Sequence, residues 1–359
     1  MLARSSTRLL LLLVILAALV VSLTVLTHNT LTKPYPGHND FMSRWEGVRS
    51  YWIDGLNPYG DEASLNIQNR IYGRPVEAGE DPGFFAYPFY TAFLIAPLAY
   101  TDYAWASAIW MVVLEVCLVG SMFVLFDLFA WRPKPLLLAF LLLWSLIFYY
   151  SARGLLLGQP GHVVYFLEVL AIGALVKGRD EWAGAALVLS TIKPQMGFLA
   201  VPFLLLWGLR ERRWRFVLSF VGVFGVLLLA SFLLQPSWIS DWIAQIQQYP
   251  SYTALGSPVW IVMQQTLGLG SAGEWAVNLV FYGFMLWAWY GVLVQRKSER
   301  WLWAVTVTLT VTHLVAPRTA TPHYVVFILP LIFYFREITL HSRRYGSLRI
   351  RRWRASEDS

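Results

Sequence analysis

The chain has 359 residues, of which 57% are hydrophobic and only 14% are charged, whereas a soluble domain carries roughly 45–50% apolar and about 25% charged residues. This composition excludes an ordinary soluble enzyme. The formal net charge is +7, but the basic residues gather in short segments between apolar runs and in the tail, which indicates membrane topology rather than a face that binds nucleic acid. The single cysteine, Cys117, excludes an intrachain disulfide.

Apolar runs recur along the chain, and several are about 17–25 residues long, enough to cross a hydrocarbon layer of ~30 Å. The first covers residues 9–26 and follows Arg4 and Arg8. It is longer than the apolar part of a signal peptide and no small-residue cleavage site follows it. We therefore expect a retained first helix with a cytoplasmic N-terminus.

A polar segment, residues 29–86, separates this helix from the next apolar run. From Lys33 to Asp81 it holds eight acidic and five basic residues, which fits the non-cytoplasmic face. Residues 87–100 are apolar but short and contain two prolines, so they predict a helix that lies on the membrane surface. Residues 28–102 together are expected to form an extracytoplasmic loop with an interfacial helix.

The distribution of positive charge orients the rest of the chain. With residues 87–100 on the surface, the helix at 103–127 runs inward, and four later basic residues become cytoplasmic. These are Arg132, Lys134, Lys177 and Arg179. Residues 183–208 must then cross outward and return, which predicts two short helices that meet at Lys193-Pro194-Gln195. Such irregular backbone is tolerated at membrane depth only inside protein or facing a watery cavity.

Further helices are predicted near residues 214–234, 275–294, 301–316 and 322–337, and an amphipathic interfacial helix at 238–248. The alternating threonines at 306, 308, 310 and 312 are interpreted as helix-packing groups. The expected architecture is an all-α polytopic membrane protein of about ten transmembrane helices. Residues 1–359 form one integral-membrane domain, both termini are cytoplasmic, and residues 338–359 form a basic tail.

The most informative polar residue is Asp40, which stands just outside the first helix. A hydroxyl becomes a good nucleophile only when a positioned base accepts its proton, and a carboxylate at this place is a candidate general base. The alternative is a solvated loop residue or a helix N-cap. Asp54 competes for the same role, although its position before Gly55 also suits a turn. Glu46 and the pair Glu80-Asp81 are interpreted as solvated surface.

Lys193 is the strongest signal within the apolar segments, because an ammonium there is expensive and usually faces a cavity or a partner. Its candidate role is to bind an anionic group, and the alternative is a side chain that snorkels to the interface. Two more polar clusters are expected on the same outer side. They comprise Arg153, Gln159 and His162, and His313, Arg318 and His323.

Short motifs follow one another in a fixed order: Asp40 after the first helix, the turn Gly55-Leu56-Asn57-Pro58-Tyr59, Tyr87-Pro88, Gly158-Gln159 and Lys193-Pro194. This order resembles glycosyltransferase family 87 of the GT-C superfamily, which includes polyprenol-phosphate-mannose-dependent mannosyltransferases of bacterial glycolipid assembly. The resemblance covers about residues 35–335. Phe89 stands where relatives often have a second proline, and Pro160-Gly161-His162 replaces an Asn-containing stretch.

The resemblance implies a GT-C-like membrane transferase that moves a hexose, mannose being the first expectation. The donor would be a polyprenyl-phosphate sugar, and the acceptor a lipid-linked or cell-surface glycan on the extracytoplasmic face, with inversion. Asp40 would be the catalytic base, and Lys193, Arg153 and Arg318 would bind the donor phosphate. The expected substrate-binding residues are Asp54, Tyr59, Tyr87, Gln159, His162 and His323, and aromatic residues of the outer loops, such as Trp45, Tyr59 and Tyr87, would supply stacking surfaces for sugar.

The expected partners are membrane lipids, the donor and the acceptor, with no nucleic acid, no metal and no other cofactor. A lipid or solute transporter or flippase of the cell envelope is the alternative, in which Lys193 and Arg153 would bind a migrating anion. A membrane scaffold is a further alternative. The transferase hypothesis requires Asp40 for its activity, whereas a transporter would tolerate Asp40→Asn and a scaffold would tolerate loss of both Asp40 and Lys193.

Overall fold

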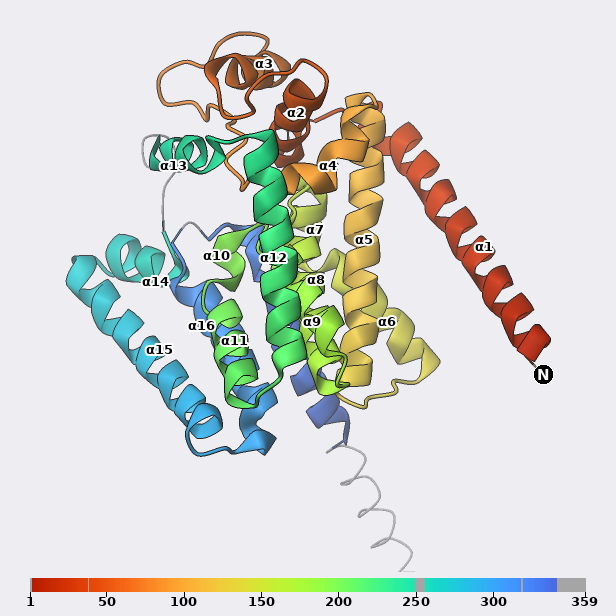
Figure 1. The fold of residues 1–359 in the computed structure, drawn as a ribbon, viewed down its shortest axis with the longest axis vertical. Coiled ribbons are helices and arrows are strands. Elements are labelled where there is room, and N and C mark those ends of the chain that lie inside the picture. Colours follow the sequence, from red (N-terminus) through yellow and green to blue (C-terminus); the bar gives the residue numbers. More distant parts are fainter. Residues whose placement is uncertain (1, 38, 249–255, 318, 341–359) are drawn as a thin grey trace, which may run out of the picture.

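The computed structural model describes residues 2–37, 39–248, 256–317 and 319–340, and these residues form helices and no strands. Figure 1 shows a bundle of helices with a smaller helical layer across one end. This layer, here called the cap, consists of α2 (Asp40–Trp52), α3 (Asp61–Tyr72), α4 (Thr91–Ala99) and α13 (Trp238–Gln248). The all-α prediction is confirmed for the described residues.

Five helical segments in the described part of the chain are long and apolar enough to cross a membrane. The first, Thr7–Thr32, runs from α1 (Leu2–Thr27) through η1 (His28–Thr32). The others are α5 (Tyr103–Leu128), α12 (Trp214–Leu234), α15 (Gly270–Leu293) and the segment Thr321–Leu340, which begins with η5 (Thr321–Phe327). A sixth span results if α6 (Pro135–Ile147) and α7 (Tyr149–Leu157), bent by 53° at their junction, cross together.

The other helices of the bundle are shorter. They are α8 (Gly161–Val176), α9 (Asp180–Ser190), α11 (Ala200–Arg210) and α16 (Trp301–Val315). The remaining short pieces are α14 (Pro258–Trp260), η3 (Ile261–Thr266) and η4 (Ser298–Arg300). Five or six helices therefore pass the length test, and the count of about ten spans stays a prediction.

The core of the bundle forms where small residues let helices approach closely. Helix α9 packs against α8 and α12, and α8 packs against α5. At Gly184 of α9, a Cβ atom would lie 2.6 Å from the Phe216 carbonyl oxygen and 2.7 Å from the Phe220 nitrogen of α12. Only glycine permits this backbone contact, as in other membrane helix pairs. Thr308 of α16 accepts a hydrogen bond from Trp289 Nε1 of α15 at 2.8 Å, which confirms its packing role.

The helical path is interrupted between α9 and α11, as the sequence predicts. Lys193 has non-helical backbone angles, and α10 (Pro194–Gly197) is a single turn before α11 begins at Ala200. Proline has no N–H for the helix ladder and disfavours helical backbone in the residue before it, which explains why α9 does not continue. In Figure 1 the break lies in the half of the bundle next to the cap.

Hydrogen bonds from side-chain amides connect the segments of the cap. Gln245 of α13 donates from Nε2 to the Tyr59 carbonyl at 3.0 Å and accepts from the Ala86 N–H at 3.0 Å. Asn57 donates to Asp241 of α13 at 2.8 Å. The predicted short helices at 87–100 and 238–248 correspond to α4 and α13, and both lie across the end of the bundle in Figure 1. Their position at a membrane interface stays a prediction.

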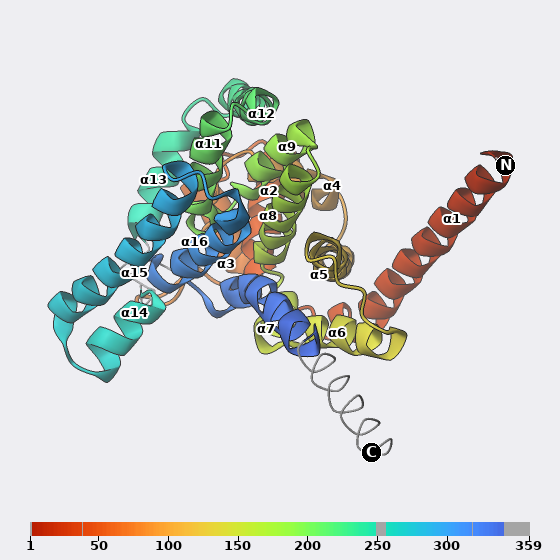
Figure 2. The same ribbon diagram turned by 90° about the horizontal axis from the view of Figure 1, so that it is seen from below.

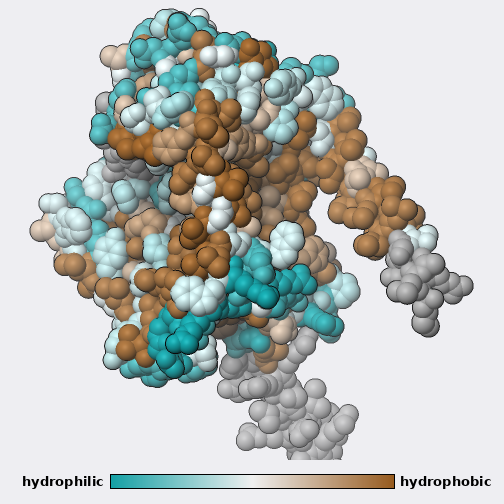
Figure 3. Space-filling model, viewed as in Figure 1, coloured by the Kyte–Doolittle hydropathy of each residue, from teal (hydrophilic) through white to brown (hydrophobic). Residues whose placement is uncertain are grey.

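The surface of the molecule suits a membrane. Figure 3 shows apolar surface along α12 and α1, between hydrophilic surface on the cap and at the opposite end. Helix α1 leans away from the bundle beside α5, and its leucines at 9–13 are exposed (Figures 1 and 2). The start of α1 and the end of segment Thr321–Leu340 both lie at the end opposite the cap. Which end is cytoplasmic stays a prediction.

Candidate functional site

Asp40 opens helix α2 but does not cap it. Asn39 is the N-cap, and its Oδ1 accepts hydrogen bonds from the Phe41 N–H at 3.2 Å and from the Tyr103 hydroxyl at 2.5 Å. The N-cap interpretation of Asp40 is therefore wrong, since its neighbour fills that position. An acidic side chain in the first turn is favoured by the helix dipole, and the Asp40 carboxylate remains available for contacts with other elements.

Three predicted residues, from separate parts of the sequence, meet at this point. Gln159, between α7 and α8, donates a hydrogen bond from Nε2 to Asp40 Oδ2. Lys193, at the break before α10, donates from Nζ to Gln159 Oε1. Gln159 and Lys193 are buried, with 6% and 3% of their surface exposed, whereas Asp40 is half-buried. The structure thus joins a carboxylate and an ammonium through one amide, and snorkelling does not describe Lys193.

Arg44 also belongs to this group, although the sequence analysis did not select it. It lies one turn after Asp40 on α2 and donates from Nη1 to the Asp40 carbonyl at 2.6 Å. Its guanidinium lies 4.8 Å from the centre of the Tyr87 ring, and Lys193 Nζ lies 5.9 Å from the same centre. The i, i+4 spacing of Asp40 and Arg44 within a helical segment is the signal that could have revealed it.

Tyr59 and Tyr87 are buried parts of the cap. The Tyr59 hydroxyl donates to the Tyr87 carbonyl at 2.6 Å, so Tyr59 positions the chain at Tyr87. Burial raises the pKa of both phenols, which keeps them protonated. The rings of Trp45, Tyr59 and Tyr87 are almost fully covered. The loop packs over its own aromatic residues, so these rings are covered in this structure, and their role in stacking on sugar stays a prediction.

The three predicted histidines are buried, and they come from three different helices, α8, α16 and η5. His162 Nε2 is paired with the Ser151 carbonyl at 3.0 Å, and His313 Nδ1 with the Leu309 carbonyl at 2.9 Å. His323 Nδ1 accepts from the Ala320 N–H at 3.1 Å. Across the described ranges, no three His, Cys, Asp or Glu side chains are arranged to hold a metal ion. The expected independence from metal remains a prediction.

The remaining predicted residues lie elsewhere. Arg153 is exposed on α7, and Arg318 lies outside the described residues. Asp54 is exposed just after α2 and lines a polar pocket of about 330 Å³ between α2 and α3. The other residues of this pocket are Glu46, Arg49, Asn66, Asn69 and Arg70.

The prediction that Glu46 lies on the solvated surface is wrong. It is buried between α2 and α3, and its Oε2 lies 3.1 Å from Arg70 Nε. Burial raises the pKa of its carboxyl, and the charge of Arg70 opposes that rise.

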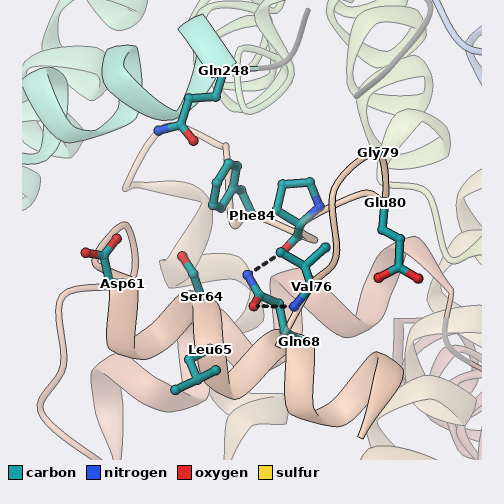
Figure 4. A pocket seen from close by; sticks show the side chains of 10 residues that line it. Asp61, Ser64, Leu65, Gln68, Val76, Gly79, Glu80, Phe84 and Gln248 are labelled. Carbon is teal, nitrogen blue, oxygen red and sulfur yellow. Dashed lines mark hydrogen bonds between the residues drawn. The ribbon is translucent and has the colours of Figure 1, made fainter. Parts of the chain in front are cut away.

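A second pocket, of about 560 Å³, lies between α3, the segment 76–84 and the end of α13 (Figure 4). Within it, Gln68 accepts from the Val76 N–H at 3.1 Å and donates to the Pro82 carbonyl at 3.5 Å. Asp61, Ser64 and Glu80 also line this pocket. Neither pocket includes Asp40 or Lys193.

Comparison with known proteins identifies one family. The model of glycosyltransferase family 87 matches residues 85–317, which is more than half of the chain. Searches of curated proteins and of solved structures gave no match. Tyr87, Arg153, Gln159, His162 and Lys193 lie inside the matched region. Asp40, Asp54, Tyr59, Arg318 and His323 lie outside it.

Proposed function

Since this chain belongs to glycosyltransferase family 87, it is a membrane glycosyltransferase, and we propose that it takes a hexose, mannose in the simplest case, from a polyprenyl-phosphate carrier. The acceptor is a lipid-linked or cell-surface glycan on the extracytoplasmic face. The observation that carries this proposal is the contact of Asp40 and Lys193 with the two ends of the Gln159 amide. It provides a base and a phosphate-binding cation within one group.

The reaction follows from these two charges. The acceptor hydroxyl attacks the anomeric carbon of the donor sugar while Asp40 accepts the hydroxyl proton. The bond from the anomeric carbon to the phosphate oxygen breaks, and the polyprenyl phosphate leaves with the electron pair. Lys193 stabilises the negative charge on that leaving group. One displacement inverts the anomeric centre, and a second catalytic carboxylate is not required because phosphate is already a good leaving group.

Arg44 is the second cation that we place at the donor phosphate. Its guanidinium and the Lys193 ammonium lie near the same ring, that of Tyr87, and both lie close to Asp40. A guanidinium can bind two phosphate oxygens at once. In this proposal Arg44 takes the role that the sequence analysis gave to Arg153, whose side chain is exposed on α7.

The position of the group within the fold suits a lipid donor. The break that holds Lys193 lies in the half of the bundle next to the cap (Figure 1). A phosphate bound there would lie near the end of the apolar surface, with its polyprenyl chain in the hydrocarbon layer and its sugar toward the cap. The acidic composition of the cap loop supports an extracytoplasmic location for this chemistry.

The direct test is transfer by purified protein in lipid nanodiscs, with radiolabelled polyprenyl-phosphate mannose as donor and a lipid extract as acceptor. Asp40→Asn should lower the rate by about 10²- to 10⁴-fold, the range for loss of a general base. Lys193→Ala should also abolish most transfer. Asp61→Asn, which changes the first residue of α3, and Lys177→Ala are matched controls that should retain it.

The outcomes separate the hypotheses. Transfer that persists in Asp40→Asn would remove Asp40 from the role of base. If the wild type transfers no label from any polyprenyl-phosphate sugar, the proposed donor class is wrong, and a lipid flippase assay on the same nanodiscs would follow.

A further inference from the structure

The Gln159 side chain links the proposed base to the proposed phosphate-binding cation. Its Nε2 donates to Asp40 and its Oε1 accepts from Lys193. An ionised carboxylate can only accept hydrogen bonds, and an ammonium can only donate them. One orientation of the amide therefore satisfies both neighbours, and the ammonium on Oε1 polarises the amide and strengthens its hydrogen bond to Asp40.

The backbone around Gln159 is anchored, so a change at Lys193 must be transmitted by the side chain. The Gln159 N–H donates to the Gly154 carbonyl at 2.9 Å. The Gly158 carbonyl accepts from Trp110 Nε1 at 2.8 Å. Gly158 has φ of +63°, and a Cβ there would lie 2.6 Å from Phe41 Cβ. The Gly158-Gln159 turn therefore packs closely against the first turn of α2.

A bound donor offers the Lys193 ammonium a second hydrogen-bond acceptor. A phosphate oxygen carries charge and is a stronger acceptor for an ammonium than the neutral amide oxygen of Gln159. When Lys193 turns to the phosphate, Gln159 loses the contact that polarises its amide. Its hydrogen bond to Asp40 then weakens, and Asp40 Oδ2 becomes available to an acceptor hydroxyl.

We propose that Gln159 is a positioning residue that couples occupancy of the donor phosphate site to the availability of Asp40. The coupling rests on the proposed function and adds a sequence of events to it, in which the donor binds before Asp40 becomes available. The carboxylate is held by Gln159 while the donor site is empty and is released when a phosphate occupies Lys193. Gln159 is thereby assigned to communication within the site rather than to direct contact with the sugar.

The test uses the full chain in nanodiscs and farnesyl phosphate as a short polyprenyl-phosphate probe. Infrared difference spectra, with probe minus without, report the carboxylate stretching bands, and the Asp40 band is the one missing from Asp40→Asn. In the wild type this band should shift on addition of probe. In Gln159→Leu the probe should still bind, measured by equilibrium binding, but the shift of the Asp40 band should be lost.

Two further variants keep the test independent of folding. Gln159→Asn retains an amide but is one methylene too short to reach both neighbours, so it should also lose the shift. Gln247→Leu, the same substitution on the exposed side of α13, should behave as wild type. An Asp40 band that shifts equally in Gln159→Leu or Gln159→Asn would overturn the coupling while the proposed function stands. A wild type that binds no farnesyl phosphate would contradict the donor class, and the coupling with it.

Discussion

The contacts of the Asp40 side chain are set by its immediate neighbours. Because Asn39 caps α2, the Asp40 carboxylate is left to contact Gln159, and through Gln159 it is linked to Lys193. Arg44 follows one helical turn later and contributes a second cation to the same face of α2. A short stretch of α2 therefore supplies both the base and part of the phosphate site in the proposed reaction.

Glu46 lies on a different face of the same helix and predicts a pH dependence of stability. Burial raises its pKa above the ordinary value of 4.5. A carboxyl with a raised pKa in the folded state favours folding below its unfolded pKa, and this contribution is lost as pH rises through the folded value. Glu46→Gln has no such titration and keeps an acceptor for Arg70.

The melting temperature of Glu46→Gln relative to wild type should therefore increase between about pH 4 and about pH 7. Thermal unfolding in nanodiscs, followed by tryptophan fluorescence at both pH values, measures this difference. A constant or decreasing difference would show that the attraction of Arg70, rather than burial, dominates the energy of Glu46.

At the scale of helices, close approach of backbones positions the site. Gly184 brings α9 onto α12, and Gly154 of α7 leaves the space that the His162 ring of α8 occupies. The break after α9 places Lys193 inside protein, where it meets Gln159. The glycines at 154 and 184 and an interrupted helix thus fix the proposed phosphate site, although the glycines carry no chemistry themselves.

The contact at Gly184 predicts a specific loss of stability. Gly184→Ala places a methyl group against the α12 backbone, which cannot move away as a flexible side chain would, and such overpacking costs about 1–3 kcal/mol. Gly222→Ala on α12 is the control, since no atom lies within 4 Å of its Cβ position. Alanine there should be neutral or stabilising by up to about 1 kcal/mol. The melting temperature of Gly184→Ala should therefore fall below that of wild type, and that of Gly222→Ala should not. Equal melting temperatures for the two variants would contradict the packing argument.

At the scale of the whole molecule, the cap and the basic loops lie at opposite ends of the bundle (Figure 1). The α8–α9 connection with Lys177 and the α11–α12 connection with Glu211 lie at the end away from α2 and α3. This arrangement agrees with the charge distribution that predicts an extracytoplasmic cap.

Cysteine labelling tests this orientation, because the chain has one native cysteine, Cys117, and it is buried. A membrane-impermeant maleimide should label Glu62→Cys, on α3, in intact cells. Glu211→Cys should be labelled only after the membrane is permeabilised. The reverse pattern would place the proposed site on the cytoplasmic face and contradict the lipid-linked donor on the outside.

The sequence by itself determined the helical class, the long polar segment after the first helix and the break at Lys193-Pro194, and it selected Asp40 and Lys193 as candidate site residues. These follow from local properties: apolar length, proline chemistry, and the cost of a charge in an apolar segment. The order of short motifs also indicated the family that the comparison identified.

Tertiary structure decided what depends on contacts between distant residues. Only the packed chain shows that Gln159 lies between Asp40 and Lys193, that Arg44 joins them, and that Glu46 is buried against Arg70. It also shows that the rings of Tyr59 and Tyr87 are covered. Sequence periodicity assigns a residue to a face of its own helix, but which other element covers that face depends on how the helices pack.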